Sequence, residues 1–282
     1  MVNARSETVS AVAKPLRGVI GRRVLSGAVF LVLFVPMVKY APVWVFDLFV
    51  VLLVAVGQWE LYRMFRRQGV SVYSGVGMIA GVLVTTSFLD PQVVSPILFV
   101  TSVGVCAWAV ARSMREGPAW GPVAVTLFGL VYVAWFLGHA ISLRALPAGV
   151  DWVFLLVWIT WVGESVAYFV GSTIGRTRLS PLVSPAKTVE GAVAQLIASP
   201  VAALVAHYWF FQSLPMLHAV MIGLLLGTIG QVGDLMESVL KRSTRTKDTG
   251  GLIPGHGGLL DRLDSLLFNT PTLFYYARLW SP

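Results

Sequence analysis

Residues Gly233 to Asp264 read GDLMESVLKRSTRTKDTGGLIPGHGGLLDRLD, a run of charged residues in an otherwise apolar chain. Of the 13 Asp and Glu residues in the protein, five lie in this stretch: Asp234, Glu237, Asp248, Asp261 and Asp264. Five basic residues are interleaved with them: Lys241, Arg242, Arg245, Lys247 and Arg262. An ionised side chain at the centre of a membrane costs about 2.5–3.5 kcal/mol on insertion scales. This density of charge therefore indicates a functional site.

The composition of the whole chain sets its class. Hydrophobic residues make up 56% of the 282 residues and charged residues 12%, and the mean hydropathy is +0.77. Such a chain cannot build an ordinary water-soluble surface, so we expect a polytopic integral membrane protein. The net charge of +8 does not indicate nucleic-acid binding, because the basic residues are spread over short segments between apolar runs. The single cysteine, Cys106, excludes an intramolecular disulfide.

Apolar runs of spanning or near-spanning length predict an all-α bundle of about nine transmembrane helices. The runs lie at about 24–39, 43–62, 74–89, 93–112, 120–143, 150–171, 189–211, 215–240 and 259–279. The third run is short and rich in glycine, and Pro271 interrupts the last. We expect a single transmembrane catalytic domain over 24–282. A basic cytoplasmic segment, 1–23, precedes it and has apolar residues at roughly helical spacing, which is typical of an interfacial helix.

Basic residues in alternate loops predict the orientation of the chain. They follow the second, fourth, sixth and eighth runs: Arg63, Arg66, Arg67, Arg112, Arg115, Arg176, Arg178, Lys187 and the cluster from Lys241 to Lys247. The intervening loops hold little beyond Lys39 and Arg144. Because cytoplasmic loops carry the excess of Lys and Arg, we expect the N-terminus in the cytoplasm and the C-terminus outside. The polar segments 172–188 and 241–258 then both open on the cytoplasmic side.

Helical spacing brings the acidic residues of the opening stretch together. Asp234, Glu237 and Lys241 stand at i, i+3 and i+7, so they share one stripe of a helix. Asp261 and Asp264 form a second acidic face on the next predicted helix. Mg²⁺ prefers hard oxygen ligands, usually one or two carboxylates completed by water and substrate phosphate. The two faces therefore predict a magnesium site inside the bundle.

Two polar segments have the character of phosphate-binding loops. In 247–258, glycines follow Asp248 and flank His256, and they allow backbone N–H groups to approach a ligand closely just before a predicted helix begins. In 184–191, which reads SPAKTVEG, Ser184 is expected as an N-cap with Pro185 at the first helical position. That helix would place Lys187 and Thr188 where an anion binds.

Structural explanations compete with these functional ones. Asp234 with Lys241 is also compatible with a buried ion pair, and glycines are common wherever helices end. His256 is either a phosphate contact or an ordinary loop residue. Glu60, near the end of the second run, is more typical of a helix-end charge than of a ligand.

The charged stretch resembles the signature of the phosphatidate cytidylyltransferase (CDP-diacylglycerol synthase) family. The resemblance rests on Ser238-Val-Leu-Lys241-Arg242, then Lys247-Asp248-Thr249-Gly250, and finally Pro254-Gly255-His256-Gly257-Gly258-Leu259-Leu260-Asp261-Arg262-Leu263-Asp264. The segment 184–191 is similar to another recurrent segment of that family, and a looser likeness covers most of the chain. One departure is Glu164-Ser165-Val166-Ala167-Tyr168, where the family has Asp-Thr/Ser-Gly-Ala-Tyr.

The resemblance implies a dimeric membrane enzyme of phospholipid biosynthesis, in a bacterial-type inner membrane, with an active site that faces the cytoplasm. Such an enzyme uses Mg²⁺ to condense CTP with phosphatidate into CDP-diacylglycerol and pyrophosphate. The implied metal ligands are Asp234 and Asp261 with Asp264 in support, and the implied catalytic residues are these three with Lys241 and Asp248. The implied substrate contacts are Ser184, Lys187, Thr188, Glu190, Ser238, Arg242, Lys247, His256, Gly257, Gly258 and Arg262.

Two other functions are compatible with the same residues. One is a related CTP-dependent lipid kinase, for example acting on polyprenol, or a synthase that acts on another lipid phosphate. The other is a transporter whose intramembrane charges bind an ion or substrate, which would move that substrate without turning over a nucleotide.

Overall fold

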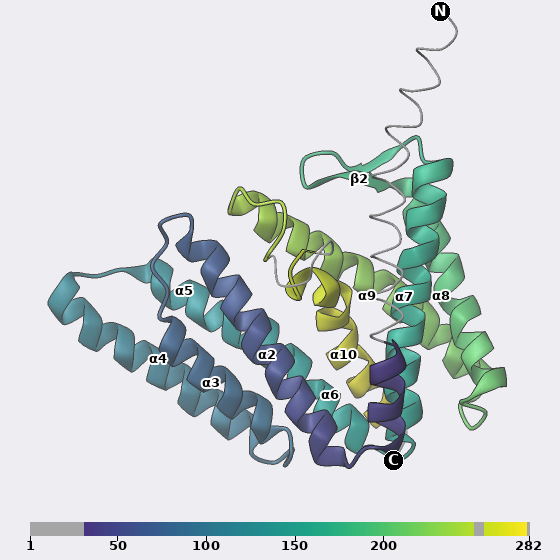
Figure 1. The fold of residues 1–282 in the computed structure, drawn as a ribbon, viewed down its shortest axis with the longest axis horizontal. Helices are drawn as coiled ribbons and strands as arrows, with labels where there is room; N and C mark the ends of the chain where they lie inside the picture. The colour runs from purple at the N-terminus through teal and green to yellow at the C-terminus, as the bar shows by residue number, and fades with distance from the viewer. Residues whose placement is uncertain (1–30, 251–256, 281–282) are drawn as a thin grey trace, which may run out of the picture.

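The structure is a computed structural model that describes residues 31–250 and 257–280, and these are almost entirely helical (Figure 1). The segment 1–23, for which the sequence predicts an interfacial helix, lies outside the described residues, as does His256. A first helical segment, Leu31–Tyr40, belongs to the first predicted run.

The remaining helices follow the predicted apolar runs closely. In chain order they are α2 (Val43–Arg66), α3 (Ser74–Ser87), α4 (Val94–Glu116), α5 (Trp120–Gly129), the π-helical turn η1 (Leu130–Trp135), α6 (Phe136–Ala145), α7 (Gly149–Thr173), α8 (Val189–Trp209), α9 (Met216–Ser243) and α10 (Leu260–Trp280). Every run predicted from residue 43 onward therefore corresponds to helical structure.

Six helical stretches among the described residues are long and apolar enough to cross a membrane. They are α2, α4, the continuous stretch Trp120–Ala145, α7, α8 and α9. Leu31–Tyr40 and α3 are apolar but shorter, and α10 begins with three charged residues among its first five. The chain is thus a multi-pass helical membrane protein, with six helices rather than nine that meet this description in its described part.

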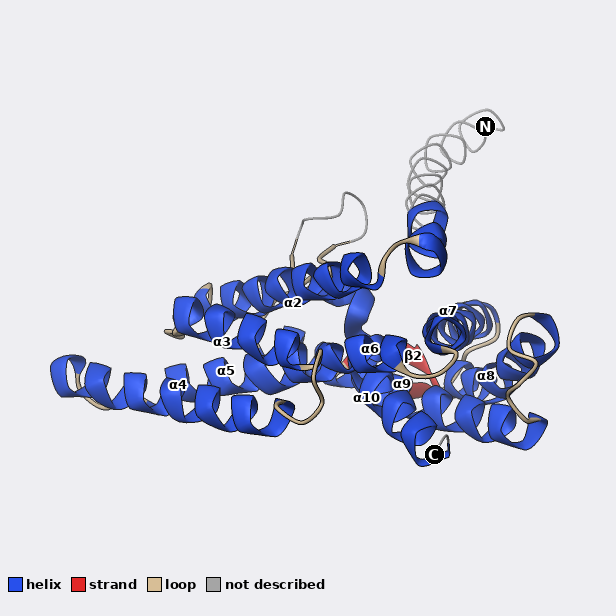
Figure 2. Cartoon of the chain, turned by 90° about the horizontal axis from the view of Figure 1, so that it is seen from below, coloured by secondary structure: helices blue, strands red, loops and turns tan. Residues whose placement is uncertain are grey.

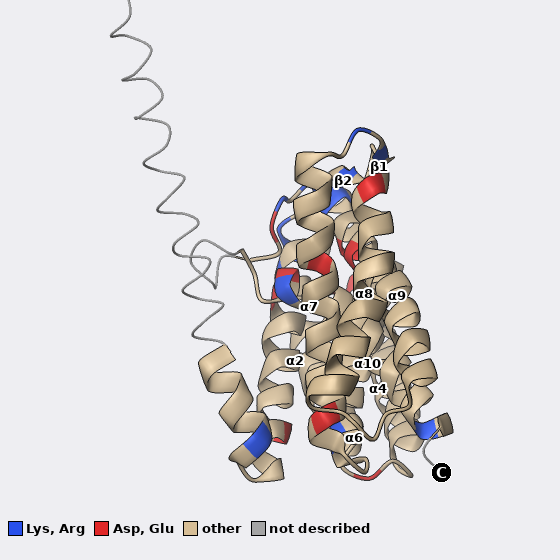
Figure 3. Cartoon of the chain, turned by 90° about the vertical axis from the view of Figure 1, so that its right-hand side faces the viewer, with Lys and Arg blue, Asp and Glu red and all other residues tan. Residues whose placement is uncertain are grey.

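Lys, Arg, Asp and Glu residues lie mostly toward the two ends of the bundle, and a band of ribbon with few of them lies between (Figure 3). Such a band is what the hydrocarbon core of a bilayer requires, because lipid offers no partner for a charge. The end that carries the polar segment after α7 also carries the C-terminal end of α9 (Figure 1). The two polar segments therefore open on the same side, as the loop charges predict.

The helices form two groups joined by α6 and α10 (Figure 2). On one side α7, α8 and α9 pack together, and on the other α2 and α3 pack with α4 and α5. Helix α10 lies between the groups and contacts both α9 and α6 extensively. This central position places the first turn of α10, with its acidic residues, where both groups can contribute side chains.

Glycines on α9 allow its neighbours to approach closely. A Cβ atom on Gly223 would collide with the backbone of Pro200 in α8, and one on Gly233 would lie 2.6 Å from the carbonyl oxygen of Asp264 in α10. Helices in lipid gain little from the hydrophobic effect when they associate, so close backbone packing through small residues takes its place. The position of α9 against α8 and α10 thus depends on the absence of these side chains.

The structure corrects the prediction for 184–191. Ser184 and Pro185 do not start a helix, because Ser184–Thr188 forms a strand, β2, that pairs antiparallel with β1 (Arg178–Ser180). Helix α8 begins only at Val189, and the Thr188 side chain caps it by accepting a hydrogen bond from the Gly191 N–H at 3.2 Å. Local capping rules favoured Ser184, but strand pairing and the cap at Thr188 decide the boundary.

The predicted interruption at Pro271 is also wrong. Helix α10 continues through Pro271, which is buried, as α8 continues through Pro200. Proline removes one backbone hydrogen bond, but neighbouring helices and local adjustment make this tolerable within a membrane bundle.

We expect Gly223→Ala to destabilise the protein, because its new methyl group meets backbone atoms of α8 that cannot move away as a side chain could. Overpacking of this kind costs about 1–3 kcal/mol. Thermal unfolding in detergent should therefore shift to lower temperature. Gly104→Ala in α4 is the matched control, because its Cβ meets nothing within 4 Å. Equal melting temperatures for the two variants would contradict the close approach of α8 and α9.

Candidate active site

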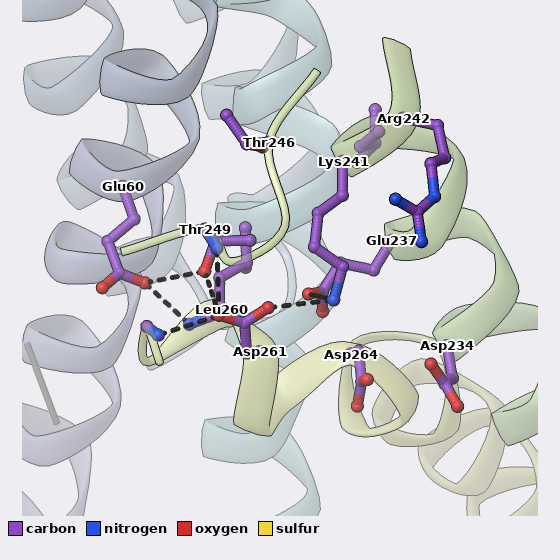
Figure 4. Close-up of polar contacts among 12 residues, drawn as sticks. Glu60, Asp234, Glu237, Lys241, Arg242, Thr246, Thr249, Leu260, Asp261 and Asp264 are labelled. Atoms are coloured by element: carbon purple, nitrogen blue, oxygen red, sulfur yellow. Dashed lines mark hydrogen bonds and ion pairs between the residues drawn. The ribbon is translucent and has the colours of Figure 1, made fainter. Parts of the chain in front are cut away.

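The ammonium group of Lys241 lies between two carboxylates where α9 meets α10 (Figure 4). Its Nζ is 2.9 Å from Glu237 Oε1 within α9 and donates to Asp261 Oδ1 of α10, also at 2.9 Å. The side chains of Glu237 and Asp261 are 0% and 6% exposed, so the three charges interact with little screening by water. The stripe predicted on α9 therefore exists and meets the acidic face of α10.

Asp261 also organises the backbone around it. Its Oδ2 accepts hydrogen bonds from the Gly258 N–H at 2.8 Å and from the Thr249 N–H at 3.0 Å. The Thr249 hydroxyl donates to the same oxygen at 3.0 Å. Because Oδ1 is held by Lys241, both oxygens of this carboxylate are engaged. Asp261 thus ties together the end of α9, the loop that follows it and the start of α10.

The β1–β2 hairpin is fixed to α9 by a second pair of charges. Lys187 Nζ of β2 lies 2.6 Å from Asp234 Oδ2, and Arg242 Nε donates to the Val183 carbonyl oxygen in the hairpin turn at 3.1 Å. The alternative that Asp234 pairs with Lys241 is not what the structure shows, since each has a different partner. Residues from two distant polar segments are thereby brought to one place.

Two cavities meet at this place. The first, of about 560 Å³, is bordered by apolar side chains of Leu31–Tyr40, α2 and α7, and at one end by the charged residues Glu164, Asp234, Asp261, Arg262 and Asp264. The second, of about 400 Å³, lies between α7, β2, α8 and α9. Glu164 and Asp234 line both cavities. One cavity is thus mostly apolar and the other is bordered by the hairpin, with carboxylates where they adjoin.

The carboxylates at this place are the kind of ligand that a divalent cation prefers. Among residues 31–250 and 257–280, no three His, Cys, Asp or Glu side chains form a ready-made metal site. Asp234, Asp261 and Asp264 all line the first cavity, but Asp261 already accepts several donors. Buried Glu237 lies 2.9 Å from Lys241 Nζ through its Oε1. Since Mg²⁺ needs only one or two protein carboxylates, Asp234 and Asp264 fit such an ion.

Four other predicted residues line the cavities, and Ser238, Gly257 and Gly258 do not. Ser184, Lys187 and Thr188 line the second cavity and Arg262 lines the first. Ser238 is buried in α9. Gly257, with φ of +83°, and Gly258 form the turn into α10 beside Asp261.

Glu190, Lys247 and Asp248 line neither of these cavities, as is also true of Lys241, Arg242, Ser238, Gly257 and Gly258. Glu190 accepts a hydrogen bond from the Thr177 N–H at 3.1 Å, which holds the start of the hairpin against α8. Lys247 and Asp248 are exposed on the loop after α9. Their place at the site remains a prediction.

Sequence reasoning missed Glu60, Glu164 and Thr249. Glu164 departs from the family pattern, and it lines both cavities. Thr249 belongs to the motif, but the sequence assigns it no role. The sequence favours a helix-end charge for Glu60, yet Glu60 is fully buried and accepts a hydrogen bond from the Leu260 N–H at 2.8 Å. The signal for Glu60 was its place in a spanning run, where an ionisable residue usually has a function.

Charges that are costly to bury, placed where two cavities adjoin, indicate a membrane-embedded enzyme that handles anionic substrates. The model of the Cytidylyltransferase family matches residues 21–280. The chain therefore belongs to the cytidylyltransferase family.

Curated relatives agree with this assignment. The chain is 31% identical over 274 residues to the phosphatidate cytidylyltransferase of Bacillus subtilis, covering 92% of this chain and 98% of the relative. It is 30% identical over 255 residues to that of Staphylococcus aureus, covering 89% and 96%. Against the Synechocystis protein of the same name, the identity is 27% over 267 residues, covering 85% and 90%.

We expect Asp261→Asn to lower the free energy of unfolding by about 1–3 kcal/mol, because an amide nitrogen in place of one oxygen strands a buried donor. Asp264→Asn should cost less, since the hydrogen bond to the Asp264 carboxylate comes from the adjacent Ser265 N–H. Unfolding of both variants in detergent measures the difference.

The same pair of variants separates a structural role from a purely ligand role for Asp261. An Asp261→Asn protein that melts like the wild type but has no turnover would contradict the structural network and favour metal binding alone.

Proposed function

We propose that the protein is a phosphatidate cytidylyltransferase that condenses CTP with phosphatidate to give CDP-diacylglycerol and pyrophosphate. The observation that carries the proposal is the meeting of the two cavities at Glu164 and Asp234, in a chain whose family match covers 21–280. One substrate is a lipid and the other a water-soluble nucleotide, so a site for both needs an apolar side and a polar side.

The first cavity suits the lipid. Phe46, Phe49 and Leu53 of α2 and Val157 of α7 border it, and Arg262 lies among the carboxylates at its charged end. Acyl chains can occupy apolar surface of this kind while the phosphate group reaches the charged residues. Phosphatidate would thus enter head group first toward Asp234.

The second cavity suits the triphosphate of the nucleotide. Its lining includes Lys187 of β2 and the first turn of α8, capped by Thr188. Positive charge and a helix N-terminus both favour phosphate oxygens. Lys187 already lies beside Asp234, so CTP bound here would bring its phosphates to the same junction as the lipid head group.

In the proposed reaction an oxygen of the phosphatidate phosphate attacks the α-phosphorus of CTP. A new phosphorus–oxygen bond forms, and the bond to the β-phosphate breaks, so that pyrophosphate leaves with the bonding electron pair. Because the attacking oxygen is already an anion, no strong general base is required. Placement and neutralisation of charge then supply most of the rate. Lys241 and Lys187 are held by carboxylates, which fixes their ammonium groups in position.

We propose Mg²⁺ as the cofactor. Asp234 and Asp264 would hold it, with Asp261 supporting through its contact with Lys241. When bound, the ion would polarise the reacting phosphate and neutralise the charge that develops on pyrophosphate.

We also propose a bacterial-type inner membrane, with the hairpin end of the bundle in the cytoplasm. The C-terminal ends of α2 and α9 carry basic residues in their last turns, as expected of a cytoplasmic side. A homodimer is proposed from the family resemblance.

Purified protein in detergent should release pyrophosphate from CTP only when phosphatidate and Mg²⁺ are both present. Excess EDTA should abolish the release, and added Mg²⁺ should restore it. Omitting phosphatidate, or replacing it by polyprenol or another lipid phosphate, tests the substrate. Full turnover in EDTA would overturn the metal proposal. Formation of CDP instead of pyrophosphate from CTP and polyprenol would favour a lipid kinase.

The orientation predicts opposite accessibility for the two ends of the bundle. Leu182→Cys in the hairpin turn and Ser213→Cys between α8 and α9, each in a Cys106→Ser background, place exposed thiols at opposite ends. In intact cells an impermeant thiol reagent should label the Ser213→Cys variant but not the Leu182→Cys variant. The reverse pattern would contradict the orientation.

A further inference from the structure

Glu60 is a buried carboxylate of α2 that contacts Thr249, in the loop after α9, and the start of α10. Its side chain has 0% exposure. Oε2 accepts a hydrogen bond from the Leu260 N–H at 2.8 Å and lies 3.5 Å from the Thr249 hydroxyl. That hydroxyl donates to Asp261 Oδ2 at 3.0 Å, so Thr249 lies between the two carboxylates (Figure 4).

The hydrogen bond to Leu260 substitutes for a helix cap. Leu260 is the first residue of α10, and the first N–H groups of a helix have no partner within it. A capping side chain normally comes from the residue just before the helix. Here that residue is Leu259, whose apolar side chain cannot accept a hydrogen bond, and the acceptor comes instead from Glu60 of α2.

Two glycines leave room for this carboxylate. A Cβ on Gly250 would collide with the Glu60 side chain, which supplies all three of its nearest atoms. A Cβ on Gly258 would lie 2.7 Å from Glu60 Oε2. Glycines that the sequence suggested for phosphate contact therefore have a second explanation. They admit Glu60.

An ion pair does not account for the burial of Glu60. Within residues 31–250 and 257–280, no Lys or Arg forms a salt bridge with it. The groups that face it are the backbone N–H at the start of α10 and the Thr249 hydroxyl, and a helix N-terminus favours a negative charge. The carboxylate is therefore placed to hold backbone rather than to neutralise a side chain.

We infer that Glu60 is a positioning residue for the proposed cytidylyl transfer, on which this inference rests. It holds the first turn of α10 and the loop at Thr249, and through them the Asp261 carboxylate that fixes Lys241. A misplacement of about 1 Å in a reacting constellation can cost about 100-fold in rate. Loss of Glu60 should therefore lower kcat strongly without removing any group that contacts the reacting phosphates.

Three substitutions distinguish hydrogen bonding from charge. Glu60→Gln keeps an oxygen acceptor at the same reach, so we expect its kcat within about fivefold of wild type, as for one modest hydrogen bond. Glu60→Asp keeps the charge but is one methylene shorter, and Glu60→Ala removes the acceptor, so both should lose about 100-fold. An active Glu60→Asp with an inactive Glu60→Gln would overturn the inference, because that order follows from a charge or metal-ligand role.

A double-mutant experiment tests the contact between Glu60 and Gly250. Gly250→Ala alone should impair turnover, because its methyl group displaces the Glu60 carboxylate. In a Glu60→Ala background the same change should cost little further activity, since the atoms it would meet are gone. Gly75→Ala, whose Cβ meets nothing within 4 Å, is the control. Fully additive losses from Glu60→Ala and Gly250→Ala would contradict the contact.

Amide hydrogen exchange gives a readout that does not depend on turnover. The Leu260 amide should exchange faster in Glu60→Ala than in wild type and near the wild-type rate in Glu60→Gln. Peptides spanning 257–265 report it by mass spectrometry. Unchanged exchange in Glu60→Ala would overturn the inference even in an active enzyme. If the Leu260 amide exchanges faster in Glu60→Ala but the wild-type protein does not turn over CTP, the structural role of Glu60 stands and the proposed function is refuted.

Discussion

The buried contact of Lys241 with Glu237 and Asp261 is the constraint on which the site depends. Breaking a buried ion pair by removing one partner leaves an uncompensated charge, which costs about 3–5 kcal/mol. Helices α9 and α10 must therefore keep the relative position that satisfies all three groups. Because Asp261 also accepts hydrogen bonds from the backbone at Thr249 and Gly258, the same constraint fixes these two residues beside the start of α10.

The bilayer explains why this charged arrangement coexists with glycine-mediated packing. Apolar side chains gain little by leaving lipid for each other, so helices associate through close backbone contact and through polar pairs. Gly233 shows both effects at one point, because it lets α9 approach the Asp264 carbonyl directly beside Asp234. The close packing of α9 against α10 thus also brings Asp234 of α9 and Asp264 of α10 to the same cavity.

Local sequence patterns predicted what depends on local structure. The apolar runs gave the helices, and spacing at i, i+3 and i+7 gave the stripe of Asp234, Glu237 and Lys241, because both follow from helical geometry. The hairpin was missed because strand pairing overrode a plausible N-cap at Ser184. The role of Glu60 was missed because its partner lies 200 residues away, and no local rule specifies such a contact.

The net negative charge where the two cavities adjoin, at Glu164 and Asp234, affects how the site can bind phosphate groups. A surface that only binds phosphate is usually basic, yet the charged end of the first cavity has four carboxylates and one arginine. Lys187 and Lys241 are each already paired with carboxylates there or nearby. A triphosphate and a lipid phosphate would add more negative charge to this place, which is unfavourable at low dielectric. This excess of carboxylates is the physical reason for proposing Mg²⁺ here, because a divalent cation would offset the charge that the substrates add.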